Sequence, residues 1–421
     1  MLIFISDLHF VDETAGKHNV PSRAFQGFFE DINKYSIKPE EIRIVFLGDI
    51  FDINRSTHWL EVEESERPWG DMENKRDKIE GHANRILNEI IKKNEATFQM
   101  FREPLEGRLP VEPERVYVPG NHDRLCNVFD SLRTKVKKNL RIPVNPEPFP
   151  PLYDDMAFGN KYGVLARHGH EYDEWNYEED PALVPIGDLI TTEIAARLPY
   201  TILQHVGNSI PPKEKENLRR NLEDIENVRP FPAAIFNWLF YQVSKNRDLK
   251  KKIEQALAEI VNNFTGLEYL GKWYKKHDKF LAFDEADKIQ AALTLFRRFN
   301  IDLAEKAMRV FAGIFGSSAA LSLDNSDKVL AGKAEEFLTH EPDYSYCVFG
   351  HTHNPIQVPI RTTERGIEQV YLNTGTWRKK YVQDRSNGFI GWKNLSYTIF
   401  YSREENKDQL FETWTGTLKE A

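Results

Sequence analysis

Five short apolar runs, each followed within a few residues by aspartate, asparagine or histidine, constrain the fold of this chain more than any other feature. Runs of this length, bounded by turn residues, are typical of buried strands. They cover residues 2–6, 42–47, 115–118, 162–166 and 346–349. Residues 22–35, between the first two runs, carry apolar side chains at helical spacing, which indicates a strand–helix–strand unit. We therefore expect an α/β fold with functional residues at the carboxyl ends of the strands.

The polar residues that follow these runs form a set suited to metal binding. The set comprises Asp7, His9, Asp49, Asn121, His122, His168, His351 and His353. Carboxylate, imidazole and amide ligands without thiolates suit Mn²⁺, our first choice, or Fe or Zn²⁺. Eight candidates exceed one closed tetrahedral site but fit two divalent metal ions that share a bridging carboxylate. In an extended segment residues two apart point the same way, so His351 and His353 are expected to face one place.

This ligand set favours hydrolysis of a phosphate ester. Two metal ions about 3.5–4 Å apart clamp the attacking and leaving oxygens of an in-line phosphoryl displacement and activate water at neutral pH. The motifs also resemble, in order and residue type, those of the calcineurin-like metallophosphoesterase superfamily. They are Asp7-x-His9, Gly48-Asp49, Gly120-Asn121-His122-Asp123, the later His168, and Gly350-His351-x-His353.

The resemblance implies a fold and a role for each of these side chains. The fold would be a four-layer α/β/β/α sandwich of two mixed sheets, formed by residues 1–174 and 340–421. The implied ligand sets are Asp7, His9 and His353 for one metal ion, and Asn121, His168 and His351 for the other. Asp49 would bridge the two ions. His122, paired with Asp123, would bind the phosphate and protonate the leaving oxygen.

Residues 175–339 follow a different pattern and lie outside the resemblance. Apolar spacing predicts successive helices and no strand, at 181–198, 213–228, 233–244, 249–264 and 285–299. We expect a helical cap inserted between two strands, close to the strand ends. Its mixed charges favour solvated helix faces over a nucleic-acid groove.

Elsewhere the sequence predicts a loop, a helix and further strands. The loop, at 52–72, is expected over the mouth of the site, and a long helix is expected at 73–101. The strands are predicted at 356–360, 369–372, 396–401 and 410–414.

Several side chains near the motifs are candidates for substrate contacts. One guanidinium group can bind two phosphate oxygens at once, which suggests phosphate binding by Arg124, Arg55 and Arg167. Asn54 is a further candidate. His170 is expected to form a hydrogen bond near the centre rather than to bind a metal ion. The pairs His58-Trp59 and Trp377-Arg378 are expected to have surface-loop and packing roles respectively.

The expected substrate contains a phosphodiester or pyrophosphate bond. It is expected to be a nucleotide or a lipid-linked phosphate ester. The histidine motifs on either side of a helical insertion are similar to those of UDP-2,3-diacylglucosamine pyrophosphate hydrolases. This chain differs in Asn121-His122-Asp123, where those enzymes typically have Asn-Arg-Asp, and in a much longer insertion. Two alternatives stay open: a nuclease acting on DNA or RNA, whose superfamily relatives carry the Asn-His-Asp triplet, and a non-catalytic scaffold.

Composition limits the partners and the location. The 421 residues exceed one usual core, and the formal charge of −9 provides no global basic field for nucleic acid. Two cysteines, Cys126 and Cys347, are too few for a disulfide framework. We expect a cytoplasmic protein, because no apolar run is long enough to cross a membrane and the chain starts in a strand. The oligomeric state stays open.

Overall fold

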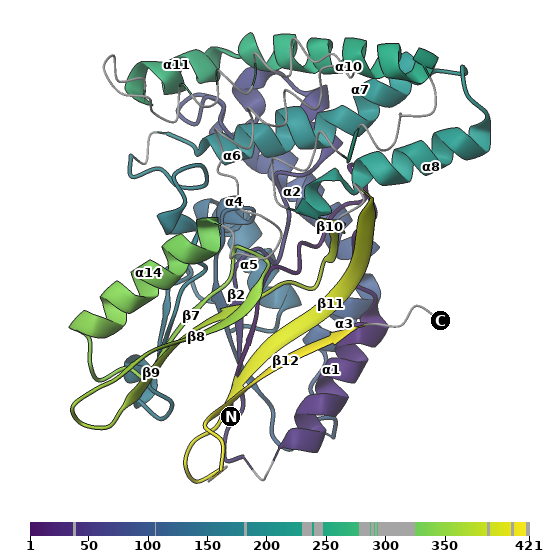
Figure 1. Cartoon of the computed structure of the whole chain (residues 1–421). Coiled ribbons are helices and arrows are strands. Elements are labelled where there is room, and N and C mark those ends of the chain that lie inside the picture. Colours follow the sequence, from purple (N-terminus) through teal and green to yellow (C-terminus); the bar gives the residue numbers. More distant parts are fainter. Residues whose placement is uncertain are drawn as a thin grey trace.

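The structure is a computed structural model in which two mixed β-sheets and surrounding helices form an α/β fold (Figure 1). It describes residues 1–36, 39–105, 107–180, 183–229, 238–239, 247–277, 287, 290, 293, 325–384, 388–405 and 408–417. Among these residues, no helix is both long and apolar enough to cross a membrane.

The first sheet has the strand order β3-β2-β1-β11-β10-β6, with β12 paired to β11. Strands β1, β2 and β3 are parallel, and β11 runs antiparallel to β1. The bounds are β1 (Leu2–Ile5), β2 (Arg43–Leu47), β3 (Glu114–Val118), β6 (Val228–Arg229), β10 (Lys379–Gln383), β11 (Phe389–Phe400) and β12 (Phe411–Thr417). The predicted strands of this sheet are confirmed to within a few residues, except that β11 begins seven residues earlier. Strands β6 and β10 were not predicted.

The second sheet has the order β4-β5-β7-β9-β8. Its three central strands are parallel, and β4 and β8 are antiparallel to their neighbours. The bounds are β4 (Tyr153–Asp154), β5 (Val164–Ala166), β7 (Tyr346–Phe349), β8 (Pro355–Thr362) and β9 (Glu368–Thr374). The four strands predicted in this part of the chain are therefore confirmed.

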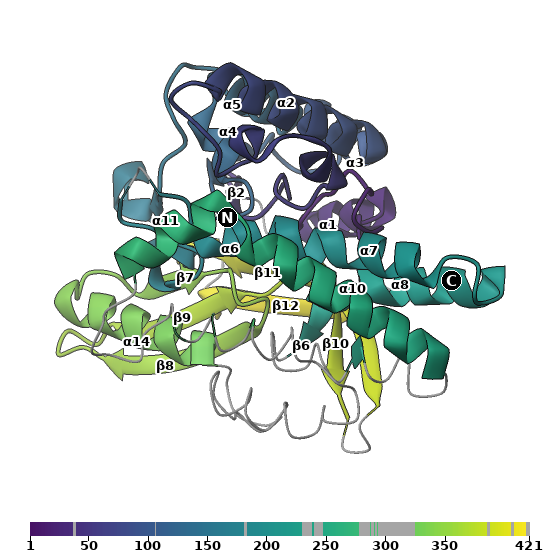
Figure 2. The ribbon, with the colours of Figure 1, turned by 90° about the horizontal axis from the view of Figure 1, so that it is seen from above.

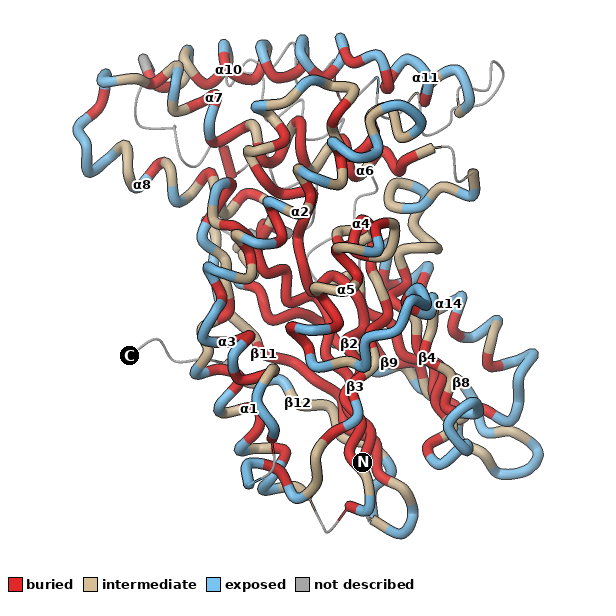
Figure 3. The backbone as a smooth tube through the Cα atoms, turned by 180° about the vertical axis from the view of Figure 1, so that it is seen from behind, coloured by how far each residue is buried: buried red, intermediate tan, exposed pale blue. Residues whose placement is uncertain are grey.

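The sheets pack against each other through side chains that alternate along their strands. Leu2 and Phe4 of β1 lie in a cluster with Val164 and Val348 of the second sheet, whereas Ile3 and Ile5 contact helices on the other face. This two-residue period is the geometry of a strand covered on both faces. Figure 3 shows the buried residues concentrated along these central strands, with exposed residues on the surrounding helices.

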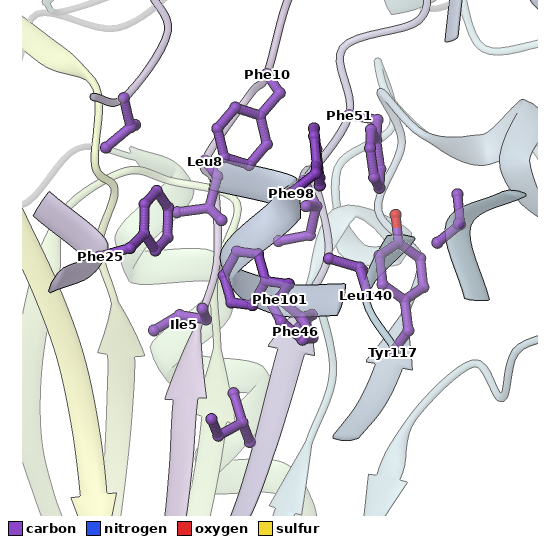
Figure 4. Packing of buried hydrophobic residues seen from close by; sticks show 14 of the residues in the cluster. Ile5, Leu8, Phe10, Phe25, Phe46, Phe51, Phe98, Phe101, Tyr117 and Leu140 are labelled. Carbon is purple, nitrogen blue, oxygen red and sulfur yellow. The ribbon is translucent and has the colours of Figure 1, made fainter. Parts of the chain in front are cut away.

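Helices cover the outer face of the first sheet and enclose an aromatic core. They are α1 (Ser22–Tyr35), α2 (Arg76–Lys93), α3 (Glu95–Arg102), α4 (Arg124–Val128) and α5 (Asp130–Asn139). Phe25, Phe98 and Phe101 pack with residues of the strands and their ends, as Figure 4 shows. This aromatic core therefore packs against β1, β2 and the segments that follow them.

The long helix predicted over 73–101 is interrupted in the structure. Asn94 separates α2 from α3 and has φ −112° and ψ 23°, outside the helical range. Its side-chain amide donates to the Ile90 carbonyl, which also accepts a hydrogen bond from the backbone N–H of Asn94 at 3.1 Å. The loop predicted over 52–72 contains two short 3₁₀ helices, η1 (Thr57–Glu61) and η2 (Glu64–Glu66). Two more are η3 (Asp155–Phe158) and η4 (His170–Tyr172).

Helices of the predicted insertion lie over one end of the two sheets (Figures 1 and 2). They are α6 (Ile186–Leu189), the π-helix η5 (Ile190–Ala196), α7 (Arg197–Val206), α8 (Pro212–Glu223), η6 (Ile225–Asn227), α10 (Arg247–Thr265) and α11 (Glu268–His277). They enclose two apolar clusters of their own. The expectation that this region has no strand is wrong, because β6 pairs with β10 of the first sheet. The helices predicted at 233–244 and 285–299 fall mostly outside the described residues.

Helix α14 (Asn325–His340) falls inside the predicted insertion but packs on the second sheet. Leu330, Ala334 and Leu338 lie in one cluster with Phe349 of β7 and Tyr371 of β9. The last part of residues 175–339 therefore covers a sheet face, whereas the earlier helices lie over the strand ends.

Candidate metal centre

The strand ends bring the eight predicted side chains into one region. Three overlapping groups can each hold a metal ion, and within each group the ligand atoms lie within 4.8 Å of one another. The groups are Asp7-His9-His353, His9-Asp49-His122 and Asp49-His168-His351. Asn121 lines the same cavity as the members of these groups. Parallel pairing explains this convergence, because the carboxyl ends of neighbouring strands meet at one edge.

The backbone at this centre adopts a conformation that L-residues rarely take. Asp7, His9, Asp49, His351 and His353 have φ values of 52°, 47°, 53°, 70° and 61°. The prediction that the last two lie in an extended segment is wrong, because β7 ends at Phe349 and the chain then turns. Such strained residues cluster at functional sites, where the surrounding structure holds them in place.

Two glycines allow the loops to approach each other. A Cβ atom on Gly48, which has φ +79°, would lie 2.3 Å from Nδ1 of His168. A Cβ atom on Gly120 would lie 2.2 Å from Oδ1 of Asp49. Any larger residue at either position would displace a candidate ligand.

We call the group Asp7, His9 and His353 site A. Nε2 of His353 lies 3.2 Å from Oδ1 of Asp7, and Nε2 of His9 lies 3.0 Å from Nε2 of His353. Oδ2 of Asp7 accepts a hydrogen bond from the backbone N–H of His351 at 3.2 Å, which leaves Oδ1 toward the two imidazoles. On its far side, Nδ1 of His9 lies 3.3 Å from Oδ2 of Asp52.

We call the group Asn121, His168 and His351 site B. Nδ1 of His168 donates to the Leu47 carbonyl at 2.9 Å, so Nε2 faces the centre. The side-chain amide of Asn121 donates to Oδ1 of Asn176 at 3.1 Å, and Nε2 of His351 lies 2.9 Å from Oδ2 of Asp173. The sequence analysis did not single out Asp173 or Asn176.

Asp49 lies between the two sites. Its Oδ1 accepts a hydrogen bond from the backbone N–H of His122 at 2.9 Å. Its Oδ2 lies 3.7 Å from Nε2 of His9 in site A and 3.2 Å from Nε2 of His168 in site B. This is the position that a bridging carboxylate requires.

Buried polar atoms at the centre fit a pair of metal ions. Oδ1 of Asp7, Oδ1 of Asn121 and Nε2 of His168 are buried and make no hydrogen bond of standard geometry among the described residues, although the first and last lie 3.2 Å from ion-pair partners. An unpaired buried polar atom costs about 1–3 kcal/mol, so native structures rarely keep one without a partner. The donor set of carboxylate, imidazole and amide oxygen is the one that Mn²⁺, Fe and Zn²⁺ accept.

The electrostatics keep the carboxylates ionised. Burial raises the pKa of Asp49, but the charges of His168 and His122 outweigh it and hold the pKa well below its usual value. Burial lowers the pKa of His122, but Asp52 and Asp49 outweigh it and raise the pKa to about 10. Asp49 similarly raises the pKa of His168 to about 10 against the effect of burial. A metal ion at this position would have to displace that proton from His168.

The predicted pairing of His122 with Asp123 is wrong. Nδ1 of His122 lies 2.8 Å from Oδ1 of Asp52. Asp123 instead accepts hydrogen bonds from the backbone N–H groups of Ile50 and Gly120, at 2.8 and 2.6 Å, and from the hydroxyl of Tyr117. It therefore holds the turn after β3 in place. The signal for Asp52 was present in the sequence, since it is a second carboxylate three residues after Asp49.

Three of the candidate substrate contacts, Arg124, Arg55 and Asn54, contact residues of the insertion. Arg124 forms an ion pair with Asp188 at 3.0 Å, and Arg55 forms one with Glu226 at 2.8 Å. The Asn54 carbonyl accepts a hydrogen bond from the Thr192 hydroxyl at 2.9 Å. The His170 ring packs near His168 and Tyr177, and burial lowers its pKa to about 3. Arg167 forms an ion pair with Glu171 at 3.3 Å. None of these residues lines the cavity described next, and their contact with phosphate stays a prediction.

A cavity of about 190 Å³ opens onto both sites, lined by the described residues. Its floor includes His9, Asp49, Asn121, His122, His351 and His353. Its roof comes from the insertion, with Trp175, Gly187, Ile190, Thr191 and Ala195. Arg378 lies in its wall, whereas the neighbouring Trp377 is buried and stacks on Phe25, as its predicted packing role requires.

No family model matches this chain, and no curated protein matches its sequence. Assignment of a function therefore depends on the geometry of the centre and its cavity.

Proposed function

We propose that this chain is a binuclear metal-dependent phosphoesterase that hydrolyses a phosphodiester or pyrophosphate bond. The observation that carries the proposal is the position of Asp49 between sites A and B, with one carboxylate oxygen near a histidine of each. Two sites joined in this way suit in-line phosphoryl displacement better than a single structural metal site does. The motif order supports membership of the calcineurin-like metallophosphoesterase superfamily and a four-layer sandwich.

Sites A and B would each hold one divalent ion, of which Mn²⁺ fits the ligands well and Fe or Zn²⁺ are alternatives. Bound ions supply activation of water at neutral pH and neutralisation of charge on the phosphoryl oxygens. The chain itself orients the ligands, through Asp52 on His9 and the Leu47 carbonyl on His168. The roof of the cavity covers part of the centre and would limit the access of bulk water to a bound phosphate.

His122 is suited to protonate the leaving oxygen. Its ring lines the cavity, and its Nδ1 bonds to the buried carboxylate of Asp52. That contact fixes the ring orientation and favours the protonated imidazole. A protonated ring at this place also attracts an anionic phosphate.

The size of the cavity favours a small phosphate ester over a nucleic-acid duplex. Its volume of about 190 Å³ lies below the ~300–1,000 Å³ of pockets that hold drug-sized ligands. A nuclease acting on DNA or RNA is therefore the second candidate, and a non-catalytic scaffold is the third.

The test is hydrolysis of bis-p-nitrophenyl phosphate by the purified full chain with Mn²⁺. His122→Ala is expected to lower kcat by about 10²–10⁴-fold while both ions stay bound. His340→Ala is the matched control, because this histidine lies exposed on α14 and bonds to the Glu336 carbonyl. Pyrophosphate esters, phosphomonoesters, and single- and double-stranded DNA are assayed in parallel to separate the candidates. Absence of turnover of every ester with both ions bound would contradict the proposal.

A further inference from the structure

The short segment 173–176 connects two ligands of site B. Oδ2 of Asp173 accepts hydrogen bonds from Nε2 of His351 at 2.9 Å and from the side-chain amide of Asn176 at 2.8 Å. Oδ1 of Asn176 in turn accepts from the Asn121 amide at 3.1 Å. Asp173 and Asn176 thus form a hydrogen-bonded bridge between His351 and Asn121, and we call it the 173–176 bridge.

The bridge determines which ligand atoms face the centre. Oδ2 of Asp173 is a carboxylate oxygen that accepts from the Asn176 amide and lies 2.9 Å from Nε2 of His351. Nε2 of His351 therefore donates, and Nδ1 is left with its lone pair for a metal ion. The Asn121 amide nitrogen is held by Asn176, which turns the buried Oδ1 atom away from it and toward the centre. Such contacts behind metal ligands set metal affinity.

The roof of the cavity rests directly on this bridge. The backbone N–H of Gly187, in α6, donates to the Trp175 carbonyl at 2.7 Å. A Cβ atom on Gly187 would lie only 2.4 Å from Oδ1 of Asn176 and 2.8 Å from the Trp175 carbonyl oxygen. The π-helix that follows α6 provides Ile190, Thr191 and Ala195 to the same roof. The bridge is therefore packed between the roof and site B.

The orienting contacts described for His9 and Asp7 of site A come from residues at the strand ends. The orienting contact to His9 comes from Asp52, on the turn after β2, and Asp7 is held by the backbone of His351 and by the Ser6 hydroxyl. These groups belong to the strand ends themselves.

We infer that Asp173 and Asn176 are positioning residues for site B, and that through them the insertion contributes to the metal affinity of site B. The inference rests on the proposed binuclear centre. It assigns the insertion a second task besides forming the cavity roof, because displacement of α6 would move Asn176 and with it the amide of Asn121.

Calorimetric titration of the full chain with Mn²⁺ measures both affinities without any substrate. Asp173→Ala and Asn176→Ala are each expected to weaken one site by about 10–100-fold and to leave the other unchanged. Equal weakening of both sites, or no weakening of either, would overturn the inference. A wild-type chain that binds two ions but hydrolyses no phosphate ester would contradict the proposed function alone.

Gly187→Ala tests the same coupling without removing any polar group. Alanine favours a helix more than glycine does, so the variant should fold, but its Cβ atom must displace Asn176. We expect about a 10-fold or greater loss of affinity at one site only. Gly271→Ala in α11 is the matched control, since nothing lies within 4 Å of a Cβ atom there, and it should keep both affinities. Retention of both affinities by Gly187→Ala would overturn the inference.

Discussion

Sites A and B share Asp49, but they depend on different parts of the chain. The ligands of site A follow β1 and β7, and Asp52 orients His9 from the turn after β2. Two ligands of site B depend instead on the 173–176 bridge, at the start of the insertion. The comparison teaches that one half of a candidate centre can be held by the strand ends, while two residues of the other half are held by the segment at the start of the insertion.

The largest expected effect comes from removing the residue that the two sites share. Asp49→Ala should abolish binding at both sites, because its Oδ2 faces a histidine of each. The loss of several kcal/mol of metal-dependent stabilisation corresponds to at least about 10³-fold in kcat/KM. Metal content and hydrolysis rates check this, with Asp343→Ala, an exposed aspartate paired with Arg365, as control. Loss of only one ion would show that Asp49 does not bridge the sites.

Metal binding should stabilise the fold by similar amounts at each site. A site at 100 times its dissociation constant gains about 2.7 kcal/mol, so addition of Mn²⁺ should raise the free energy of unfolding and a chelator should remove the gain. Denaturant titrations at several Mn²⁺ concentrations measure this. In Asp173→Ala the contribution of site B should need a higher Mn²⁺ concentration, while that of site A persists. Identical curves with Mn²⁺ and with a chelator would contradict binding at either site.

Asp52→Asn should reverse the pattern expected for the 173–176 bridge. The change removes the charge behind His9 and is expected to weaken site A by about 10–100-fold and to leave site B unchanged. It should also lower kcat, because His122 loses its carboxylate partner. Calorimetric titration beside Asp173→Ala shows whether the two variants affect different sites. If both variants weaken the same site, the division into separately supported halves is wrong.

The smallest expected effect on activity is that of Asp123→Asn. Asp123 holds the turn after β3 and contacts Tyr117, Ile50 and Gly120 rather than His122. We expect a loss of about 1–3 kcal/mol in unfolding free energy, from hydrogen bonds that the amide cannot accept. The kcat/KM of the metal-loaded variant at a temperature where it is folded should stay within about 10-fold of wild type. A loss as large as that of His122→Ala would restore Asp123 to a direct catalytic role.

The strands and the candidate ligands could be predicted because their signals are local. Each of the five apolar runs corresponds to a strand, and each candidate ligand follows its run by a few residues. The helix at 22–35 matched α1 at both ends, since five buried side chains on one face define it. Short polar interruptions were harder to predict, as Asn94 shows, because Asn competes for backbone hydrogen bonds without breaking the apolar pattern.

Partners of the ligands could not be predicted because they lie far apart in the chain. His351 and Asp173 are separated by 178 residues, and His122 and Asp52 by 70. Asp123 is adjacent to His122 in the sequence, but the choice of Asp52 as partner depends on how the turns after β2 and β3 meet. The left-handed backbone at five ligands was missed for a related reason, since tertiary contacts hold conformations that local preference disfavours.

By itself, the sequence indicated the candidate metal ligands, the positions along the chain of the strands that precede them, and a helical region between residues 175 and 339. Only the tertiary structure decided which ligands form each site, that Asp49 lies between the sites, and that the roof rests on the 173–176 bridge. The physical reason is the distance along the chain over which each kind of interaction acts. Apolar spacing and turn residues act over a few positions, whereas a hydrogen-bond partner or a shared carboxylate depends on how distant loops pack.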